Sequence, residues 1–274
     1  MTTSIQQRRE NILASAYRSG HVNVRQLSEG LGVSEATIRR DLHGLASEGL
    51  LELNHGGASV IRGSDYSFLS KSMRNVEAKH IIAELAAQLV ADGEQLFLDS
   101  GSTCYAMAAF LRSKRGLSVI VNSVRTAQEL NAPGINVLIL GGQYRPDRVD
   151  TIGPMASASL DKLRGYLAFV GTDGLGMDFG LTAIDIESAH IFGQAVKNAR
   201  QSILLADSSK FDAPGLYKIA NWTEIAKVIT EKRPSDAWCE FFASQHIELI
   251  YPQANPCDPH NNPLGDNNAK ESNS

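Results

Sequence analysis

The chain has 274 residues, of which 43% are hydrophobic and 20% charged, and its net charge is −4. This length suits a small module followed by a domain of ordinary size, since domains commonly run about 100–200 residues. The composition is that of a globular protein, and no apolar run approaches the roughly 18 residues that a membrane helix needs. The negative net charge argues against a protein that coats nucleic acid non-specifically.

The N-terminus and the cysteines indicate the compartment. The first residues, MTTSIQQRREN, are charged and have no apolar segment, so they do not resemble a secretory signal. The three cysteines, Cys104, Cys239 and Cys257, do not form a disulfide framework. We therefore expect a soluble, cytoplasmic protein without a membrane partner.

Two short helices are predicted at the start of the chain. Apolar residues fall at near-helical spacing from residue 5 to residue 18, which indicates the first helix. Val24, Leu27 and Leu31 follow at positions i, i+3 and i+7, and Gly32 then ends the second helix. A tight turn then separates this second helix from a third, and helix, turn and helix in this order make a helix-turn-helix unit.

A third helix begins after Ser34, whose hydroxyl can cap a backbone N–H group. Ile38, Leu42 and Leu45 lie at i, i+4 and i+7, so they face inward. The residues predicted to face outward are Ala36, Thr37, Arg39, Arg40 and His43. A short helix with cationic residues near its N-terminus fits the major groove of DNA, which is about 12 Å wide.

A wing follows this helix. Residues 50–54 and 58–61 have the pattern of two strands, and Gly56-Gly57 between them can adopt the positive φ of a tight hairpin. Residues 1–61 therefore predict a winged helix-turn-helix domain that binds double-stranded DNA. The alternative is a helical protein-interaction module whose arginines are only solvated. The residues expected to contact DNA are Ser34, Ala36, Thr37, Arg39, Arg40, His43, His55 and Gly56.

The run LSEGLGVSEATIRRDLHGLASEGLL, followed by HGGA, resembles the N-terminal signature of the DeoR family of bacterial transcription regulators. The resemblance extends to about residue 252. Family members usually carry an arginine in the strand before HGG, where this chain has Leu53. The resemblance therefore implies a wing that lacks one contact to the phosphate backbone.

Residues 62–75, RGSDYSFLSKSMRN, are polar and without a clear period, and they are predicted to be a linker. After a helix at 77–90, short apolar runs alternate with helical patterns, which is typical of an α/β domain with a mostly parallel sheet. We expect this domain to span residues 76–252 and the tail, 253–274, to be disordered. The predicted strands are 96–99, 118–122, 136–142, 167–174, 202–209, 227–230 and 247–252.

Polar residues follow most of these strands, and in such sheets ligands bind beyond the carboxyl ends of the strands. The segment GSTC opens a helix, whose free N–H groups make an anion site. The residues expected to surround a bound phosphorylated sugar are Asp99, Ser100, Gly101, Ser102, Thr103, Asn122, Gly142, Asp173 and Lys210. The alternative for each residue alone is an ordinary turn, helix cap or surface position.

The motifs DSGST, NS, GGQYR, GTDGLG and ADSSKF, together with Glu187, match the effector domain of the DeoR family in order and spacing. That domain is similar in fold to sugar-phosphate isomerases and binds phosphorylated sugars as signals. The resemblance implies phosphate contacts from residues 100–103 and Lys210. It also implies polar contacts from Asp99, Asp173 and Glu187.

No metal, cofactor or catalytic residue is expected. Cys257 and His260 are too few ligands for a closed zinc site, and Gly174-Leu175-Gly176 lacks the rest of a dinucleotide fingerprint. No Ser-His-acid arrangement can be argued from the scattered histidines.

The leading hypothesis is a homo-oligomeric transcription regulator, a repressor of a carbohydrate-metabolism operon that is controlled by a phosphorylated sugar. The alternative is an enzyme, a sugar-phosphate isomerase or deacylase with an appended helical module. Asp99, Asp173, Glu187 and Lys210 would then supply its acid-base groups.

Overall fold

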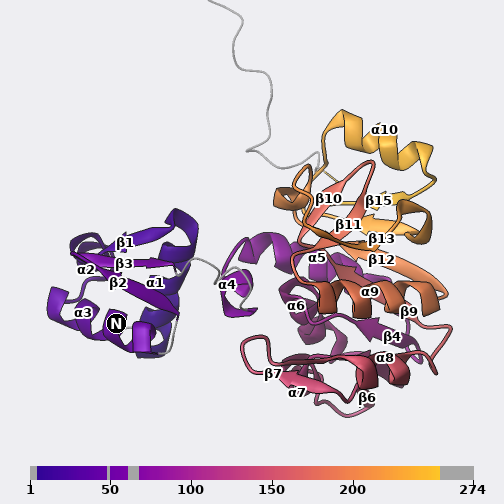
Figure 1. Cartoon of the computed structure of the whole chain (residues 1–274), viewed down its shortest axis with the longest axis horizontal. Helices are drawn as coiled ribbons and strands as arrows, with labels where there is room; N and C mark the ends of the chain where they lie inside the picture. The colour runs from indigo at the N-terminus through magenta and orange to yellow at the C-terminus, as the bar shows by residue number, and fades with distance from the viewer. Residues whose placement is uncertain (1–4, 48–49, 61–67, 254–274) are drawn as a thin grey trace, which may run out of the picture.

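The computed structural model describes residues 5–47, 50–60 and 68–253 (Figure 1). The N-terminal domain contains helices α1 (Ile5–Ser19), α2 (Val24–Leu31) and α3 (Glu35–Ser47) and strands β1 (His21–Asn23), β2 (Leu51–Asn54) and β3 (Gly57–Val60). The three strands form an antiparallel sheet in the order β1-β3-β2. Strand β1 was not predicted, because three residues are too few to show an alternating pattern.

The ends of the N-terminal helices follow the expected chemistry. The Ser34 hydroxyl accepts a hydrogen bond from the Thr37 amide at 3.2 Å, as a cap of α3 does. Gly32 has a φ of +65°, the left-handed conformation that closes α2. Ile38, Leu42 and Leu45 are buried in the apolar core of this domain, so the predicted inward face of α3 is confirmed.

The larger domain is built on a seven-stranded parallel sheet in the order β15-β14-β12-β9-β4-β5-β6. Its strands correspond to the seven predicted ones, although most of them begin one residue earlier and end sooner. Their bounds are β4 (Gln95–Leu98), β5 (Leu117–Val121), β6 (Ile135–Ile139), β9 (Leu167–Gly171), β12 (Gln201–Leu205), β14 (Lys227–Ile229) and β15 (Glu248–Ile250).

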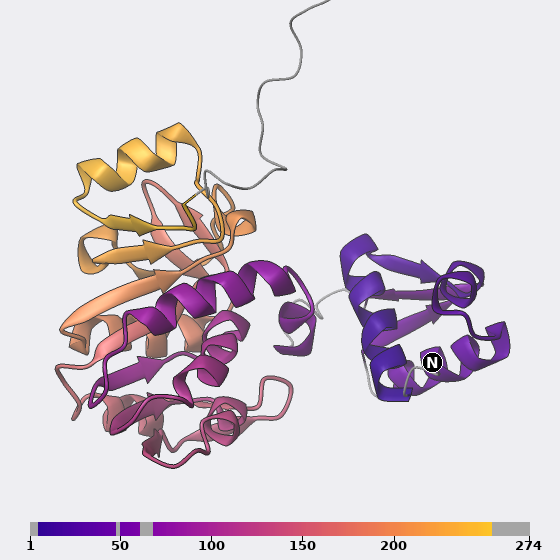
Figure 2. The same ribbon diagram turned by 180° about the vertical axis from the view of Figure 1, so that it is seen from behind.

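Helices cover both faces of this sheet. On one face, α5 (Val76–Gln88) and α6 (Ser102–Leu111) cover the sheet, as Figure 2 shows. Leu96 and Leu98 of β4 are buried in the apolar core on this face. On the other face, α8 (Pro154–Leu160), α9 (Ile186–Asn198) and α10 (Asp236–Ser244) pack over Phe97 and its neighbours. Successive residues of a buried strand thus serve two cores, which explains the continuous apolar runs in the sequence.

The remaining elements of the larger domain lie outside the seven-stranded sheet. Two short strands, β7 (Gln143–Arg145) and β8 (Asp150–Ile152), pair with each other, and β10 (Gly174–Gly176), β11 (Gly180–Ala183) and β13 (Tyr217–Ala220) form a second small sheet. Helix α7 (Val124–Glu129) and the 3-10 turns η2 (Ser208–Lys210) and η3 (Trp222–Glu224) complete the domain. No helix in the described ranges combines the length and the apolar character that crossing a bilayer requires.

The segment predicted as a linker contains a short helix, α4 (Phe68–Ser72), over its described part. Phe68 is buried and meets the ring of Tyr105 of α6 edge to face, with 5.3 Å between the ring centroids. The guanidinium of Arg125 also lies over the Phe68 ring, 4.7 Å from its centre. These contacts dock α4 on the larger domain.

The order of the strands identifies where a ligand site belongs. From β4 the chain moves outward through β5 and β6, then returns to β9 on the other side of β4 and moves outward through β12, β14 and β15. The direction of winding therefore reverses between β4 and β9. In open α/β sheets a crevice forms beyond the carboxyl ends of the strands at such a reversal.

Candidate effector site and DNA-binding surface

A cavity of about 260 Å³ lies at this reversal. This volume lies just below the lower end of the range for ligand pockets, about 300 Å³, so the cavity suits a single small molecule and not a larger ligand. Seven of the ten effector contacts expected from sequence line it: Asp99, Ser100, Gly101, Ser102, Thr103, Asp173 and Lys210. The structure also adds charged and polar residues that were not among the predicted contacts: Lys71, Arg74, Asn75, Lys79, Arg148, Asp150, Ser188 and, from the ADSSKF motif, Asp207.

Asp99 fixes the floor of the cavity. One of its carboxylate oxygens accepts the Gly101 amide at 2.8 Å and the other accepts the Gly171 amide at 2.5 Å, so it joins the loop after β4 to the end of β9. Burial raises the pKa of this carboxyl, and the hydrogen bonds from the two amides oppose the increase. Asp99 therefore acts first as a positioning residue for the loop that begins α6.

The first turn of α6 forms the anion-binding part of the floor. Gly101 precedes this ten-residue helix in an extended conformation, and Ser102 and Thr103 begin it at the cavity wall. The amides of a first helical turn have no partner within the helix, and the helix dipole adds positive potential there. A phosphate or carboxylate placed against residues 101–103 would accept these hydrogen bonds.

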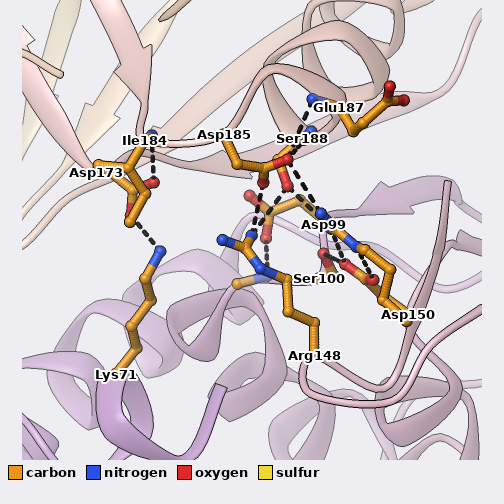
Figure 3. Close-up of polar contacts among 12 residues, drawn as sticks. Lys71, Asp99, Ser100, Arg148, Asp150, Asp173, Ile184, Asp185, Glu187 and Ser188 are labelled. Carbon is orange, nitrogen blue, oxygen red and sulfur yellow. Dashed lines mark hydrogen bonds and ion pairs between the residues drawn. The ribbon is translucent and has the colours of Figure 1, made fainter. Parts of the chain in front are cut away.

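Ser100 belongs to a buried network beside that turn. Its hydroxyl donates to Asp150 at 2.9 Å (Figure 3). Asp150 in turn accepts two hydrogen bonds from Arg145, at 2.8 and 2.7 Å. Arg145 also contacts Asp185 at 3.0 Å. A planar guanidinium bound bidentately by a carboxylate holds a fixed geometry, so this network orients the Ser100 side of the cavity.

Arg148 approaches the cavity from the same loop. Its guanidinium contacts Asp185 at 2.8 Å and the Ser188 hydroxyl at 3.0 Å, as Figure 3 shows. Arg145 and Arg148 both lie in the QYRPDRVD stretch, which follows the predicted contact Gly142. Arg145 belongs to the GGQYR motif, but neither arginine was predicted as a site residue. The sequence feature that could have identified them is the position of two arginines shortly after Gly141-Gly142, at the end of a predicted strand.

Three residues expected at the site do not line the cavity. Asn122 is fully buried behind Ser100 and donates to the Thr151 carbonyl at 3.2 Å. A Cβ atom at Gly142 would lie 2.4 Å from the Ile152 carbonyl oxygen, so the glycine permits the close approach of β8. Glu187 is exposed on α9 and its carboxylate points away from the network in Figure 3.

Cations from α4 and from the first turn of α5 face the floor. The Lys71 ammonium lies 2.5 Å from the Asp173 carboxylate, whose second oxygen accepts the Ile184 amide at 3.0 Å. Burial lowers the pKa of Lys71, and the Asp173 carboxylate opposes the decrease. Lys79 donates to the Arg74 carbonyl, and burial lowers the pKa of Lys79 to about 8.

Lys210 lies on the opposite rim, in the turn η2. Asp207 caps this turn by accepting the Ser209 amide at 3.0 Å, and it also accepts a hydrogen bond from Asn75 at 3.0 Å. Within the described part of the chain the Lys210 ammonium has no ion-pair partner, so it remains available to a ligand. The cavity thus combines amide donors and cations for an anion with carboxylates for hydroxyl groups.

The second functional surface is the exposed side of α3. Arg39, Arg40 and His43 are exposed there, as expected. Arg39 pairs with Glu35 one turn earlier at 2.8 Å, whereas Arg40 has no ion-pair partner among the described residues. Ala36 is also exposed, and Ser34 and Thr37 share the capping hydrogen bond at the start of this helix.

The wing hairpin presents His55 and Gly56 to solvent. Gly56 has a φ of +82°, which confirms the tight turn expected of this glycine. Gly57 is required for another reason, because a Cβ atom there would lie 1.9 Å from the Val22 carbonyl oxygen of β1. Leu53, in place of the arginine that the family resemblance led us to expect, is exposed on β2.

The described residues contain no group of three or more His, Cys, Asp or Glu side chains arranged to hold a metal ion. Cys257 and His260 lie outside the described residues, as does nearly all of the predicted tail. A winged helix-turn-helix domain joined to an α/β domain with a small-ligand cavity defines a ligand-responsive DNA-binding protein.

Comparison with known proteins agrees with this class. Residues 74–232 match the model of the DeoR C terminal sensor domain, and residues 8–63 match that of the DeoR-like helix-turn-helix domain. The chain therefore belongs to the DeoR family of transcription regulators. Residues 64–73, which include α4, lie outside both matched regions.

The curated relatives described here are named as regulators or repressors, and the chain matches nearly their whole length. The chain is 33% identical to the HTH-type transcriptional regulator GlpR of Haloferax volcanii, over 82% of this chain and 89% of that protein. It is 32% identical to the lactose phosphotransferase system repressor of Lactococcus lactis subsp. lactis, over 89% and 97%. It is 26% identical to the glycerol-3-phosphate regulon repressor of Escherichia coli K12, over 89% and 97%.

Among solved structures, the chain is similar to a D-ribose-5-phosphate isomerase in complex with phospho-erythronic acid. The TM-score is 0.38 and the identity 17%, over 50% of this chain and 54% of that one. The curated relatives described above are named as regulators and repressors, so the enzyme alternative is set aside and the DNA-binding function is retained.

Proposed function

We propose that this protein is a repressor whose binding to operator DNA is controlled by a phosphorylated sugar or polyol bound in the cavity beside β4 and β9. The observation that carries the proposal is the placement of the α6 amides opposite Lys210, Lys71 and Lys79 within one small cavity. Such a site stabilises a compact dianion. Asp173 then provides acceptors for the hydroxyl groups of the same ligand.

The names of the relatives support this assignment. Two of them are called repressors, one of a lactose phosphotransferase system and one of a glycerol-3-phosphate regulon. We infer that this chain controls genes for the uptake or breakdown of a carbohydrate. Because one recognition helix reads only a half-site, we also propose that the protein acts as a dimer or a larger homo-oligomer.

The substitution Thr103→Asp tests the ligand assignment. The helix dipole favours a carboxylate in the first turn of α6, so the fold should be preserved, but this carboxylate repels a phosphate bound there. We expect the affinity for whichever of glycerol 3-phosphate, ribose 5-phosphate or fructose 6-phosphate binds the wild type to fall by about tenfold or more, which is about 1.4 kcal/mol.

Titration calorimetry on the full chain measures this change. The matched control is Met155→Asp, which adds the same charge at the second residue of α8, an exposed position outside the cavity. Unphosphorylated ribose and fructose should bind far more weakly than their phosphates. Equal affinities of the wild type and Thr103→Asp for a bound sugar phosphate would show that the anion lies elsewhere.

A further inference from the structure

Helix α4 forms one wall of the effector cavity, although it lies between the two domains in sequence. Phe68 and Lys71 line the cavity together with Arg74 and Asn75, which follow the helix. The wall is held from outside by the edge-to-face contact of Phe68 with Tyr105. Any molecule that fills the cavity therefore touches the segment that leads back to the DNA-binding domain.

An ion pair between Lys71 and Asp173 joins this wall to the cavity floor. The Lys71 side chain is 25% exposed and that of Asp173 is 16% exposed, so both charges are largely removed from water. Asp173 is fixed from behind by the Ile184 amide. Lys71 depends on Asp173 for its partner, and Arg148 and Lys210 lie near enough to add repulsion.

The segment after Lys71 contacts both domains. Met73 is half-buried and packs against the apolar core of the N-terminal domain. Asn75, in a left-handed conformation with a φ of 50°, donates to Asp207 and to the Ser209 hydroxyl, on the rim that also carries Lys210. A change in the position of α4 therefore reaches the helix-turn-helix domain through the chain and through Met73.

We propose that α4 is an effector-responsive wall, in which Lys71 leaves Asp173 to bind the anionic group of the ligand while Asp173 receives the ligand's hydroxyl groups. Occupancy then changes the position of the segment that joins the two domains. This inference rests on the proposed function, because it assigns the regulation of the same cavity. A ligand that contacts Lys71 directly has a different affinity for the two positions of α4, which is the condition for shifting a population.

The experiment is hydrogen exchange measured by mass spectrometry on full-length wild type, Lys71→Met and Asp173→Asn. Lys162→Met, at an exposed position after α8, is the control. Without ligand, both variants of the pair should exchange the amides of residues 68–75 about tenfold faster than wild type, because the pair no longer holds the wall. The control should exchange like the wild type.

The second arm adds glycerol 3-phosphate, ribose 5-phosphate or fructose 6-phosphate. In the wild type, the sugar phosphate that binds should slow exchange at residues 100–104 and change exchange at residues 68–75. In Lys71→Met the change at 68–75 should be lost while the protection at 100–104 persists at higher ligand concentration. This pattern supports the responsive wall.

Three other results overturn it and are distinguishable. Protection of residues 100–104 without any change at 68–75 in the wild type would retain the proposed ligand site and refute the moving wall. Absence of protection at 100–104 with all three compounds would refute the proposed function and the wall together. Wild-type exchange rates at 68–75 in Lys71→Met without ligand would show that the ion pair does not hold α4.

Discussion

Lys79 is the most buried of the cations that line the cavity, with 6% of its surface exposed. Burial lowers its pKa to about 8, although the nearby carboxylate of Asp207 opposes this effect and Lys210 and Arg74 add to it. The unfolded chain therefore binds the Lys79 proton more tightly than the folded chain does. The contribution of this group to stability accordingly rises between about pH 8 and 10.5.

The same shift predicts the pH dependence of effector binding. A phosphate monoester remains a dianion above its second pKa near 6, whereas the protonated fraction of Lys79 falls from about nine-tenths at pH 7 to about one-tenth at pH 9. Affinity for a sugar phosphate should therefore fall about tenfold over this range. Calorimetry at several pH values measures it, and Lys79→Met should remove most of the dependence. An equal dependence in Lys79→Met would assign it to another group.

At the scale of elements, the recognition helix α3 is held against α1 by a buried ion pair. Arg8 of α1 contacts Asp41 of α3 at 2.5 Å, and the two side chains are 9% and 4% exposed. Arg9 adds a longer contact to Asp41 at 3.7 Å. Asp41, which follows the two arginines of α3, therefore stabilises the packing of α3 on α1, and this packing leaves Arg39 and Arg40 on the exposed side.

Removing this carboxylate leaves a buried guanidinium without its partner. Asp41→Ala should therefore destabilise the N-terminal domain by about 3 kcal/mol. Glu35→Ala breaks the exposed pair with Arg39 and should cost less than about 0.5 kcal/mol. Exchange of the α3 amides in the full chain reports both values, and similar protection factors in the two variants would argue against a structural role of Asp41.

The sequence was sufficient for the elements whose pattern is local. The seven strands of the parallel sheet are apolar on both faces, and Ser34 and Gly32 mark helix ends by their own chemistry. The strands β1, β7, β8, β10, β11 and β13 were missed because none is a continuous apolar run and each is stabilised by a partner outside its own short segment. Their pairing is a tertiary property that no short window of sequence contains.

The site was predicted in part for the same reason. The rule that ligands bind beyond strand ends located Ser100–Thr103, Asp173 and Lys210. It could not locate Lys71 or Lys79, which precede the sheet and reach the cavity only because α4 and α5 fold back over it. The family resemblance added Glu187, which does not line the cavity, because the sequence does not reveal which side of the first turn of α9 faces it.

In the whole molecule, the proposed function links the DNA-binding domain, which carries α3, to the ligand cavity of the larger domain. Arg40 and the paired Arg39 supply the exposed cations of α3, and the cavity between β4 and β9 supplies the signal. Coupling between two such sites requires that the ligand favour one arrangement of the domains, and coupling free energies of this kind are typically about 1–3 kcal/mol.

The most direct test is the affinity of the full-length protein for DNA from upstream of its own gene, at about 0.15 M salt, with and without each sugar phosphate. The account predicts specific binding that one sugar phosphate changes about tenfold or more, and that Arg40→Ala weakens by about tenfold or more without altering affinity for the sugar phosphate. Specific DNA binding that is unchanged by a sugar phosphate saturating the cavity would contradict the account.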